Sequence, residues 1–146
     1  MTSSATNPVG IIGAGTMGTG IAQAAAAAGW EVRLFDIEPS LIEQAVSNIS
    51  NRFIRLVDKG RITIEQSTEF QNRITTTTTL EDLADCDLII EAIVEDFDIK
   101  SKVLRSVGEL SSDAIIATNT SSLSVSKLGN ASGYPERVVG MHFFNP

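Results

Sequence analysis

A glycine-rich turn near the start of the chain constrains the fold more than any other feature. The short apolar run Val9–Ile12 is followed by Gly13-Ala14-Gly15-Thr16-Met17-Gly18 and then by the alanine-rich residues 21–28. This order predicts a strand, a tight turn and a helix. Gly13 permits the turn, Gly15 lets a pyrophosphate approach the backbone, and Gly18 lets the helix pack closely on the strand. The helix N-terminus then offers free N–H groups to the phosphates.

An acidic residue follows at the distance that a dinucleotide site requires. Residues 31–35 predict a second strand, and Asp36 stands at its end, close to the expected spacing of about 20 residues from the glycines. A carboxylate there can accept hydrogen bonds from both hydroxyls of the adenosine ribose and repels a 2'-phosphate. The next residue is Ile37, so no arginine is present to accommodate that phosphate. The sequence therefore predicts NAD, rather than NADP, as the cofactor.

The rest of the chain alternates between strand and helix patterns. Apolar or β-branched runs bounded by turn residues predict strands at residues 73–77, 87–91, 114–118 and 137–141. Helices are predicted at Phe97–Leu110 and, briefly, at residues 125–128. Strands that alternate with helices form parallel sheets covered on both faces. The sequence thus predicts an α/β fold, a doubly wound parallel sheet of the Rossmann type.

One departure from the plain fold is predicted: an inserted helical hairpin after the second strand. Ser40 and Glu43 have the spacing of a capping box at a helix start. Apolar residues then recur at helical spacing until Lys59-Gly60 ends the helix, at Ile42, Ala45, Ile49, Phe53 and Leu56. Residues 63–71 predict a shorter helix that returns antiparallel to the first.

Composition narrows the possible partners. The 18 acidic and 11 basic residues give a net charge of −7, which argues against nucleic-acid binding and against broad binding to anionic membranes. No apolar run approaches the ~20 residues that cross a bilayer. Residues 1–7 lack the features of a secretory or transit signal, and we expect a disordered tail there, followed by one domain at residues 8–146.

The single cysteine and the basic residues of the hairpin carry weaker signals. Cys86 has no partner for a disulfide and no metal-binding pattern around it, so we expect no metal site, a buried or half-buried thiol and a cytoplasmic protein. Four basic residues cluster in the hairpin, at Arg52, Arg55, Lys59 and Arg61. They are interpreted either as solvated helix surface or as a contact for an anionic substrate tail.

The only histidine stands in the final run Met141-His142-Phe143-Phe144-Asn145-Pro146. Imidazole exchanges protons readily near neutral pH because its unperturbed pKa is about 6.5. In isolation, a single histidine between apolar residues is interpreted as an ordinary core or strand-end histidine rather than as a catalytic one. The segment Asn119-Thr120-Ser121-Ser122 in isolation indicates a turn and helix cap.

Taken together, these segments resemble a known family. The glycine turn, Asp36, the run from Ile90 to Asp96, Asn119-Thr120-Ser121-Ser122 and the His142 segment are similar to the NAD-binding domain of the L-3-hydroxyacyl-CoA dehydrogenases. The resemblance extends over residues 8–146. It implies oxidation of the 3-hydroxyl of an acyl-CoA, with hydride transfer to NAD+, in fatty acid metabolism such as β-oxidation.

The resemblance also implies roles for individual residues. His142 matches the catalytic base, Ser121 the serine that hydrogen-bonds the reacting oxygen, and Asn119 an asparagine beside the nicotinamide and substrate. Glu95 and Lys100 match residues near the nicotinamide ribose. Asn145 is assigned to the catalytic residues. The cofactor site is assigned Thr16, Met17, Ala92 and Ile93. The CoA part of the substrate is assigned Ser121, Arg52, Arg55 and Lys59.

The family pattern contains parts that this sequence does not. A glutamate that orients the histidine is expected shortly beyond Pro146, followed by an all-helical domain that covers the acyl group and forms a homodimer. We therefore expect the chain to be a fragment of a longer enzyme, monomeric and inactive alone. Two alternatives remain: a free-standing dinucleotide-binding module without catalysis, and a hydroxy-acid dehydrogenase that does not use CoA.

Overall fold

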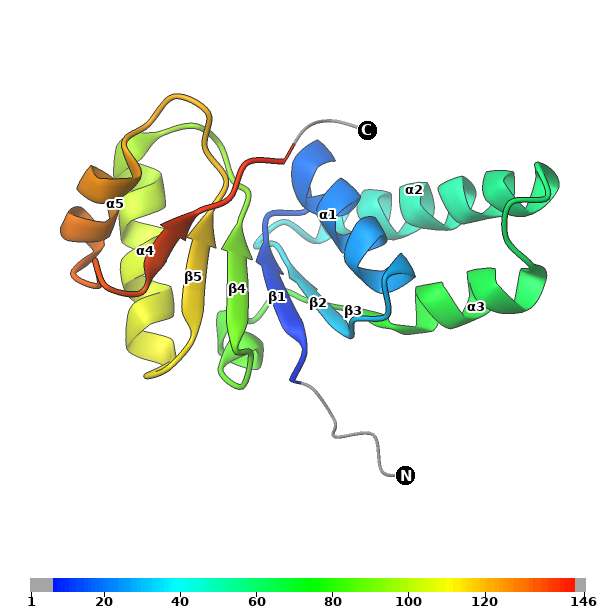
Figure 1. Cartoon of the computed structure of the whole chain (residues 1–146), viewed down its shortest axis with the longest axis horizontal. Helices are drawn as coiled ribbons and strands as arrows, with labels where there is room; N and C mark the ends of the chain where they lie inside the picture. The colour runs from blue at the N-terminus through cyan, green and yellow to red at the C-terminus, as the bar shows by residue number, and fades with distance from the viewer. Residues whose placement is uncertain (1–6, 144–146) are drawn as a thin grey trace.

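A computed structural model describes residues 7–143 of the chain, and within them six parallel strands form one sheet with helices on both faces (Figure 1). The strand order is β3-β2-β1-β4-β5-β6, which confirms the predicted doubly wound fold. The elements are β1 (Val9–Ile12), α1 (Thr16–Ala27), β2 (Val32–Phe35), α2 (Pro39–Asp58), α3 (Ile64–Asn72), β3 (Ile74–Thr77), the 3-10 helix η1 (Leu80–Leu83), β4 (Leu88–Glu91), α4 (Phe97–Leu110), β5 (Ile115–Thr118), α5 (Val125–Ser132) and β6 (Val138–Gly140).

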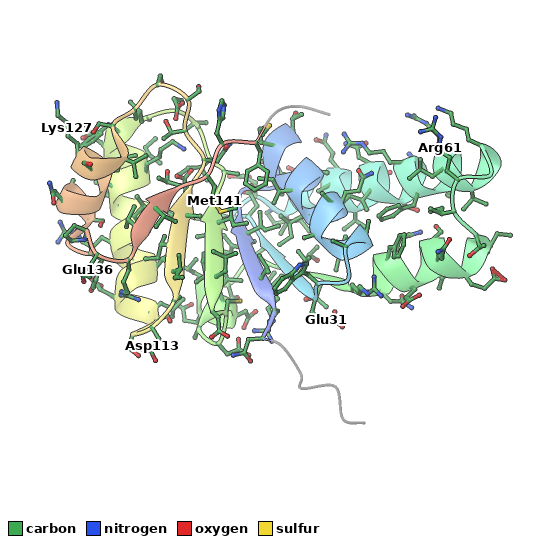
Figure 2. The ribbon with its side chains drawn as sticks, in the orientation of Figure 1. Glu31, Arg61, Asp113, Lys127, Glu136 and Met141 are labelled. Atoms are coloured by element: carbon green, nitrogen blue, oxygen red, sulfur yellow. The ribbon has the colours of Figure 1, made fainter. Side chains whose placement is uncertain are left out.

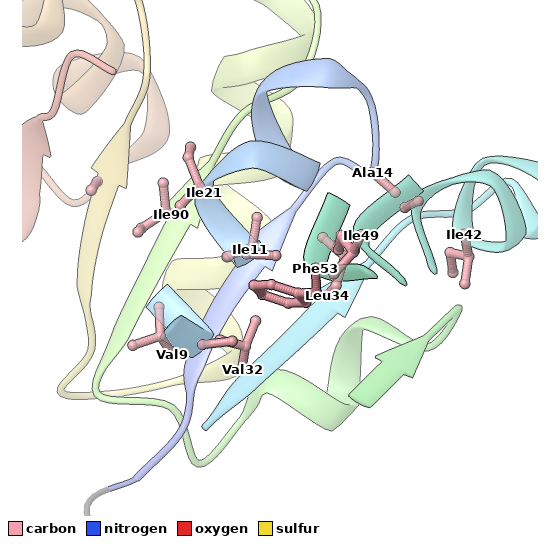
Figure 3. Packing of buried hydrophobic residues seen from close by; sticks show 14 residues of the cluster. Val9, Ile11, Ala14, Ile21, Val32, Leu34, Ile42, Ile49, Phe53 and Ile90 are labelled. Atoms are coloured by element: carbon pink, nitrogen blue, oxygen red, sulfur yellow. The ribbon is translucent and has the colours of Figure 1, made fainter. Parts of the chain in front are cut away.

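The two faces of the sheet build two separate cores. Successive strand residues point to opposite faces, so Ile11 packs with α1 and α2 whereas Ile12 packs with α4 and α5. The same alternation sends Ile90 to the first core and Ile89 to the second. Figure 3 shows part of the first core, in which the Phe53 ring of α2 lies among the aliphatic side chains of β1 and β2. Because both faces are covered there, the central strand β1 is apolar and buried along its whole length.

The predicted hairpin is formed by α2 and α3, which extend away from the sheet between β2 and β3 (Figure 1). Its helices are joined by Phe53 and Phe70, whose ring centroids lie 5.5 Å apart. Four of the five predicted apolar positions of α2 are buried, and Leu56 is partly buried. Gly60 follows the helix with a φ of 70°, as the predicted terminus requires.

The predicted capping box at Ser40 and Glu43 is wrong. Helix α2 begins earlier, at Pro39, whose fixed φ suits the first helical position, and no side chain caps it. The only capping box within residues 7–143 stands at the start of α3, where the Thr63 hydroxyl accepts from the Gln66 N–H and the Gln66 side chain accepts from the Thr63 N–H. Helix α1 also begins earlier than the alanine run indicates, at Thr16, within the glycine-rich segment.

The carboxyl ends of the strands form one row across the sheet. The residue that follows β1, β4 or β5 donates one more hydrogen bond, to the last residue of the adjacent strand. Gly13 N–H donates to Phe35 O at 2.8 Å, and Ala92 N–H to Ile12 O at 2.8 Å. Asn119 N–H donates to Glu91 O at 2.9 Å. Predicted site residues from distant parts of the sequence therefore lie side by side at the edge where parallel sheets bind ligands.

Two further observations limit the chemistry. Cys86 is buried as predicted, and burial raises the pKa of its thiol to about 11, so it is no candidate nucleophile. No helix in residues 7–143 is long and apolar enough to span a bilayer, and no group of three or more His, Cys, Asp and Glu residues there could hold a metal ion. Of the tail predicted at residues 1–7, residues 1–6 lie outside the described residues, whereas the Asn7 amide donates to Asp87 Oδ2 at 3.1 Å.

Candidate NAD and substrate site

Glycine stands at the three positions of the turn for different structural reasons. A Cβ on Gly13 would lie 2.6 Å from Ala92 O, and a Cβ on Gly18 would lie 1.6 Å from Gly13 O. A Cβ on Gly15 would meet nothing within 4 Å. Packing of the backbone therefore requires Gly13 and Gly18, whereas the space above Gly15 is open for a ligand. The first turn of α1 has neither a side-chain cap nor an acidic residue, which fits the pyrophosphate of NAD.

Asp36 is held in place by the turn that it faces. Its Oδ2 accepts from the Ala14 N–H at 2.8 Å and its Oδ1 from the Glu38 N–H at 2.9 Å. Asp36 also lines a cavity of about 520 Å³, together with Gly13, Gly15, Ala92 and Ile93 of the predicted cofactor site. This largely apolar cavity fits the adenosine half of the cofactor.

One face of α4 completes this cavity and was missed by the sequence analysis. The residues are Ile99, Lys102, Val103 and Ser106. Their spacing of three or four places them on a single side of the helix. That spacing was visible in the sequence, but only the position of α4 beside the glycine turn shows which side faces the ligand.

A second cavity, of about 360 Å³, gathers the predicted catalytic residues. It is lined by Met17, Ile93, Glu95, Asn119, Thr120, Ser121, His142 and Phe143. Ile93 lines both cavities, so the two adjoin. His142 is exposed rather than sealed in the core, and a bound molecule can reach its ring. Asn145 lies outside the described residues.

Two backbone contacts hold the segment that carries His142. Met141 N–H donates to Thr118 O at 3.1 Å, and Phe143 N–H donates to the Asn119 Oδ1 at 3.1 Å. His142 thus stands between two residues that are fastened to the end of β5. Figure 2 shows the neighbouring Met141, which is partly buried against the core under α1. Asn119 therefore positions the histidine segment, a contact that the sequence did not reveal.

Glu95 organises the loop that carries Ser121. Its Oε1 accepts from the Thr120 hydroxyl at 2.7 Å, and its Oε2 accepts from the Ser121 N–H at 3.0 Å and the Ser122 hydroxyl at 3.2 Å. Partial burial works to raise the pKa of Glu95, but these hydrogen bonds and the nearby Lys100 lower it to about 2. The carboxylate therefore remains ionised and keeps the loop in place at any physiological pH.

The shifted pKa of Glu95 predicts how the loop responds to acid. Because the folded value lies below the ordinary value of 4.5, the stabilisation is complete above about pH 4.5 and is lost as the pH falls towards 2. We expect the Ser121 amide resonance to titrate with a midpoint near 2 in NMR spectra, and to lose that transition in Glu95→Gln. A midpoint near 4.5 in the unmodified chain would contradict this assignment of the hydrogen bonds.

Lys100, predicted to lie near the nicotinamide ribose, is fully buried in the structure. Its side chain has no exposed surface, and its Nζ lies 2.6 Å from Glu91 Oε2, also fully buried. In this arrangement Lys100 can influence a ligand only through the groups that it binds. The place of Lys100 near the nicotinamide ribose stays a prediction, whereas its pairing with the carboxylate of Glu91, at the end of β4, was not apparent from the sequence.

The basic residues of the hairpin lie apart from both cavities. Arg55 and Lys59 are exposed, whereas the partly buried Arg52 donates to Gln23 Oε1 of α1 at 3.2 Å. None of these residues is among those that line the two cavities described above. Arg61 stands at the outer end of the hairpin (Figure 2). Arg52 thus has a role in packing, and Arg55 and Lys59 remain available to a solvent-borne anion.

The strand order, the glycine turn and the acidic residue after β2 define a dinucleotide-binding domain of a dehydrogenase type. A family model described as 3-hydroxyacyl-CoA dehydrogenase, NAD binding domain, matches residues 8–146. The chain therefore belongs to this family, and its cofactor is NAD.

Individual relatives agree with this assignment. The chain is 42% identical over 139 residues to a 3-hydroxybutyryl-CoA dehydrogenase of Bradyrhizobium diazoefficiens, covering 94% of this chain and 47% of the relative. It is 40% identical over 146 residues to a 3-hydroxybutyryl-CoA dehydrogenase of Mycobacterium tuberculosis, covering 99% and 51%. The crystal structure of (S)-3-hydroxybutyryl-CoA dehydrogenase from Ralstonia eutropha superposes with a TM-score of 0.93 at 39% identity, covering 97% and 50%. The chain thus spans about half the length of these relatives.

Proposed function

We propose that this chain is the cofactor half of a longer, cytoplasmic NAD-dependent 3-hydroxyacyl-CoA dehydrogenase. One observation carries the proposal: His142 and Ser121 line a cavity that adjoins, through Ile93, the cavity beside the glycine turn. A dinucleotide laid along the turn extends from the first cavity into the second. The chain covers about half of its relatives, which supports a second half of the enzyme. We assign to that half a helical domain that covers the acyl group and forms the homodimer.

Four residues of the second cavity have a role in this reaction. His142 accepts the proton of the substrate 3-hydroxyl, and the Ser121 Oγ hydrogen-bonds the same oxygen as it becomes a carbonyl. Asn119 keeps the histidine segment in place through Phe143. NAD+, when bound, supplies the acceptor for the hydride that leaves the same carbon. Glu95 keeps the Ser121 amide and hydroxyl on the cavity wall.

The residues of the glycine turn bind and orient the cofactor. The N–H groups at the start of α1, including those of Thr16, Met17 and Gly18, receive the pyrophosphate. Asp36 accepts the adenosine ribose hydroxyls, while its bond to the Ala14 N–H fixes the carboxylate. Ala92 lines the first cavity and Ile93 lines both, so the two residues flank the path of the cofactor.

We assign the exposed cations of α2 to the phosphates of CoA. Exposed ion pairs contribute little binding free energy each. Replacing both Arg55 and Lys59 by alanine should therefore weaken CoA binding about three- to tenfold. Calorimetric titration of CoA at low and high salt measures this effect, which should shrink as salt screens the charges. Replacing Arg105 and Lys127 on the opposite side of the sheet provides the control, with unchanged affinity expected.

The outcome of the CoA titration also decides between the alternatives. Absence of CoA binding, or equal loss in the control variant, would favour a hydroxy-acid dehydrogenase that does not use CoA. Binding of NADH by the 146-residue chain without turnover is expected in either case, because the acyl pocket lies in the other half. Turnover by this chain at rates typical of enzymes, about 1 to 10³ per second, would contradict the proposal that catalysis requires the other half of the enzyme.

A further inference from the structure

The core beneath the second cavity contains a buried ion pair. Glu91 is the last residue of β4 and Lys100 belongs to the first turns of α4. Both side chains are 0% exposed, and Glu91 Oε2 lies 2.6 Å from Lys100 Nζ. Removing two charges from water is costly, and a buried pair of this kind is weak evidence of a stabilising function. Its partners therefore indicate what it does.

Every polar atom of the pair bonds to a segment that lines the site. Glu91 Oε1 accepts from the Thr118 hydroxyl, and its Oε2 also accepts from the Ile93 N–H at 2.8 Å. Lys100 Nζ donates to Ile93 O at 3.3 Å and to Asn119 O at 3.1 Å. The fourth oxygen near Lys100 Nζ is Glu95 Oε1, at 3.6 Å.

These contacts join the two loops that form the second cavity. Ile93 and Glu95 follow β4, whereas Asn119 follows β5, and all three line that cavity. Without the pair, the carbonyls of Ile93 and Asn119 would lose a common donor. Glu95 would lose the cation beside it, and with it part of its hold on Ser121. The adenosine cavity shares only Ile93 with this network.

We propose that Glu91 is a positioning residue for the nicotinamide half of the cofactor. It touches no ligand, because it has no exposed surface, and acts through Lys100 on the segments around Ile93, Asn119 and Glu95. The adenosine half, held by the glycine turn and Asp36, does not depend on it. This inference rests on the proposed location of the nicotinamide in the second cavity.

The test compares two ligands that differ only in the nicotinamide. NADH and ADP-ribose are titrated calorimetrically against the chain and against Glu91→Gln. We expect NADH affinity to fall about tenfold in the variant, the loss of one charge-assisted hydrogen bond, while ADP-ribose affinity changes less than about twofold. Equal changes for both ligands, or none, would overturn the proposal.

A second variant keeps the test valid if Glu91→Gln fails to fold, since it leaves a buried lysine charge unpaired. The double variant Glu91→Gln/Lys100→Met removes both charges at similar volume, so thermal stability should return to near the unmodified level. The preference for NADH over ADP-ribose should nevertheless stay lost. If the preference returns together with stability, the pair is merely structural and the proposal is wrong.

Two controls separate this inference from the proposed function. Arg137→Lys weakens the clamp on the carbonyls of Gly108 and Ser111 at the end of α4, so it should lower stability without changing the ligand preference. Ser121→Trp fills the second cavity from an exposed position and should abolish the NADH preference. If the tryptophan has no effect, or the unmodified chain has no preference, the nicotinamide lies elsewhere and the proposed function fails. If the tryptophan acts and Glu91→Gln does not, only the role of Glu91 fails.

Discussion

Replacing Gly15 with alanine is expected to abolish NADH binding while the protein folds normally. A Cβ at this position meets nothing within 4 Å, so the substitution meets no steric resistance in the protein. The methyl group occupies the space through which the pyrophosphate reaches the N–H groups of α1. Loss of two charge-assisted hydrogen bonds corresponds to at least about a hundredfold weaker binding.

The matched control is Gly18→Ala, which adds the same methyl group three residues later. Its Cβ would lie 1.6 Å from Gly13 O, and Gly13 is held at the end of β2 by the hydrogen bond from its N–H to Phe35 O. We expect α1 to shift and the free energy of unfolding to fall by about 3–5 kcal/mol, a large part of the stability of an ordinary domain.

Calorimetry and thermal unfolding of both variants check this pair of predictions. Gly15→Ala should retain the melting temperature and lose NADH binding, whereas Gly18→Ala should melt at a much lower temperature. Normal NADH affinity in Gly15→Ala would mean that the pyrophosphate does not lie on this turn. An unchanged melting temperature in Gly18→Ala would mean that the close packing of α1 on the turn is incorrect.

His142→Gln is expected to lower turnover of the full enzyme at least about 100-fold, the low end for general acid–base catalysis. Glutamine retains hydrogen-bonding capacity but cannot take the hydroxyl proton. His142 lines only the second cavity, so the affinity for ADP-ribose should stay unchanged. The rate of NADH oxidation with acetoacetyl-CoA measures the effect in an enzyme that joins this chain to its second half.

The variant Phe143→Leu provides a control in the same segment. It preserves the hydrogen bond from the backbone N–H of residue 143 to Asn119 Oδ1 and leaves the His142 ring unchanged. Turnover should therefore fall less than about tenfold, because the change is apolar and small. Undiminished turnover in His142→Gln would remove the histidine from the mechanism. A similar loss in both variants would indicate a structural role for the whole segment.

The fold could be predicted because its signals are local. Each strand is a short apolar or β-branched run, and the glycine turn has its required context on both sides. The location of the site followed from topology, since Gly13, Ala92 and Asn119 each come directly after a strand of one parallel sheet. The helix starts were less predictable, and at α2 the proline overrode the expected capping box.

The interactions within the site could not be predicted from the pattern. Glu95 and Ser121 are 26 residues apart, and nothing in either segment indicates that the carboxylate would accept the serine N–H. Lys100 shows the same limit, because a lysine on an amphipathic helix is ordinarily solvated and only the packed structure shows it beneath the sheet edge. Resemblance to a family identified these residues, but the structure shows how Lys100 and Glu95 support the others.

The proposed proton transfer depends most on where the nicotinamide ring lies when NADH binds this chain. Intermolecular nuclear Overhauser effects between the nicotinamide protons and an isotope-labelled protein measure this directly. We expect contacts to the Met17 methyl group and to the His142 ring, which line the second cavity. Contacts confined to residues of the first cavity, such as Lys102 and Ser106, would place the ring away from the histidine and contradict the proposed proton transfer.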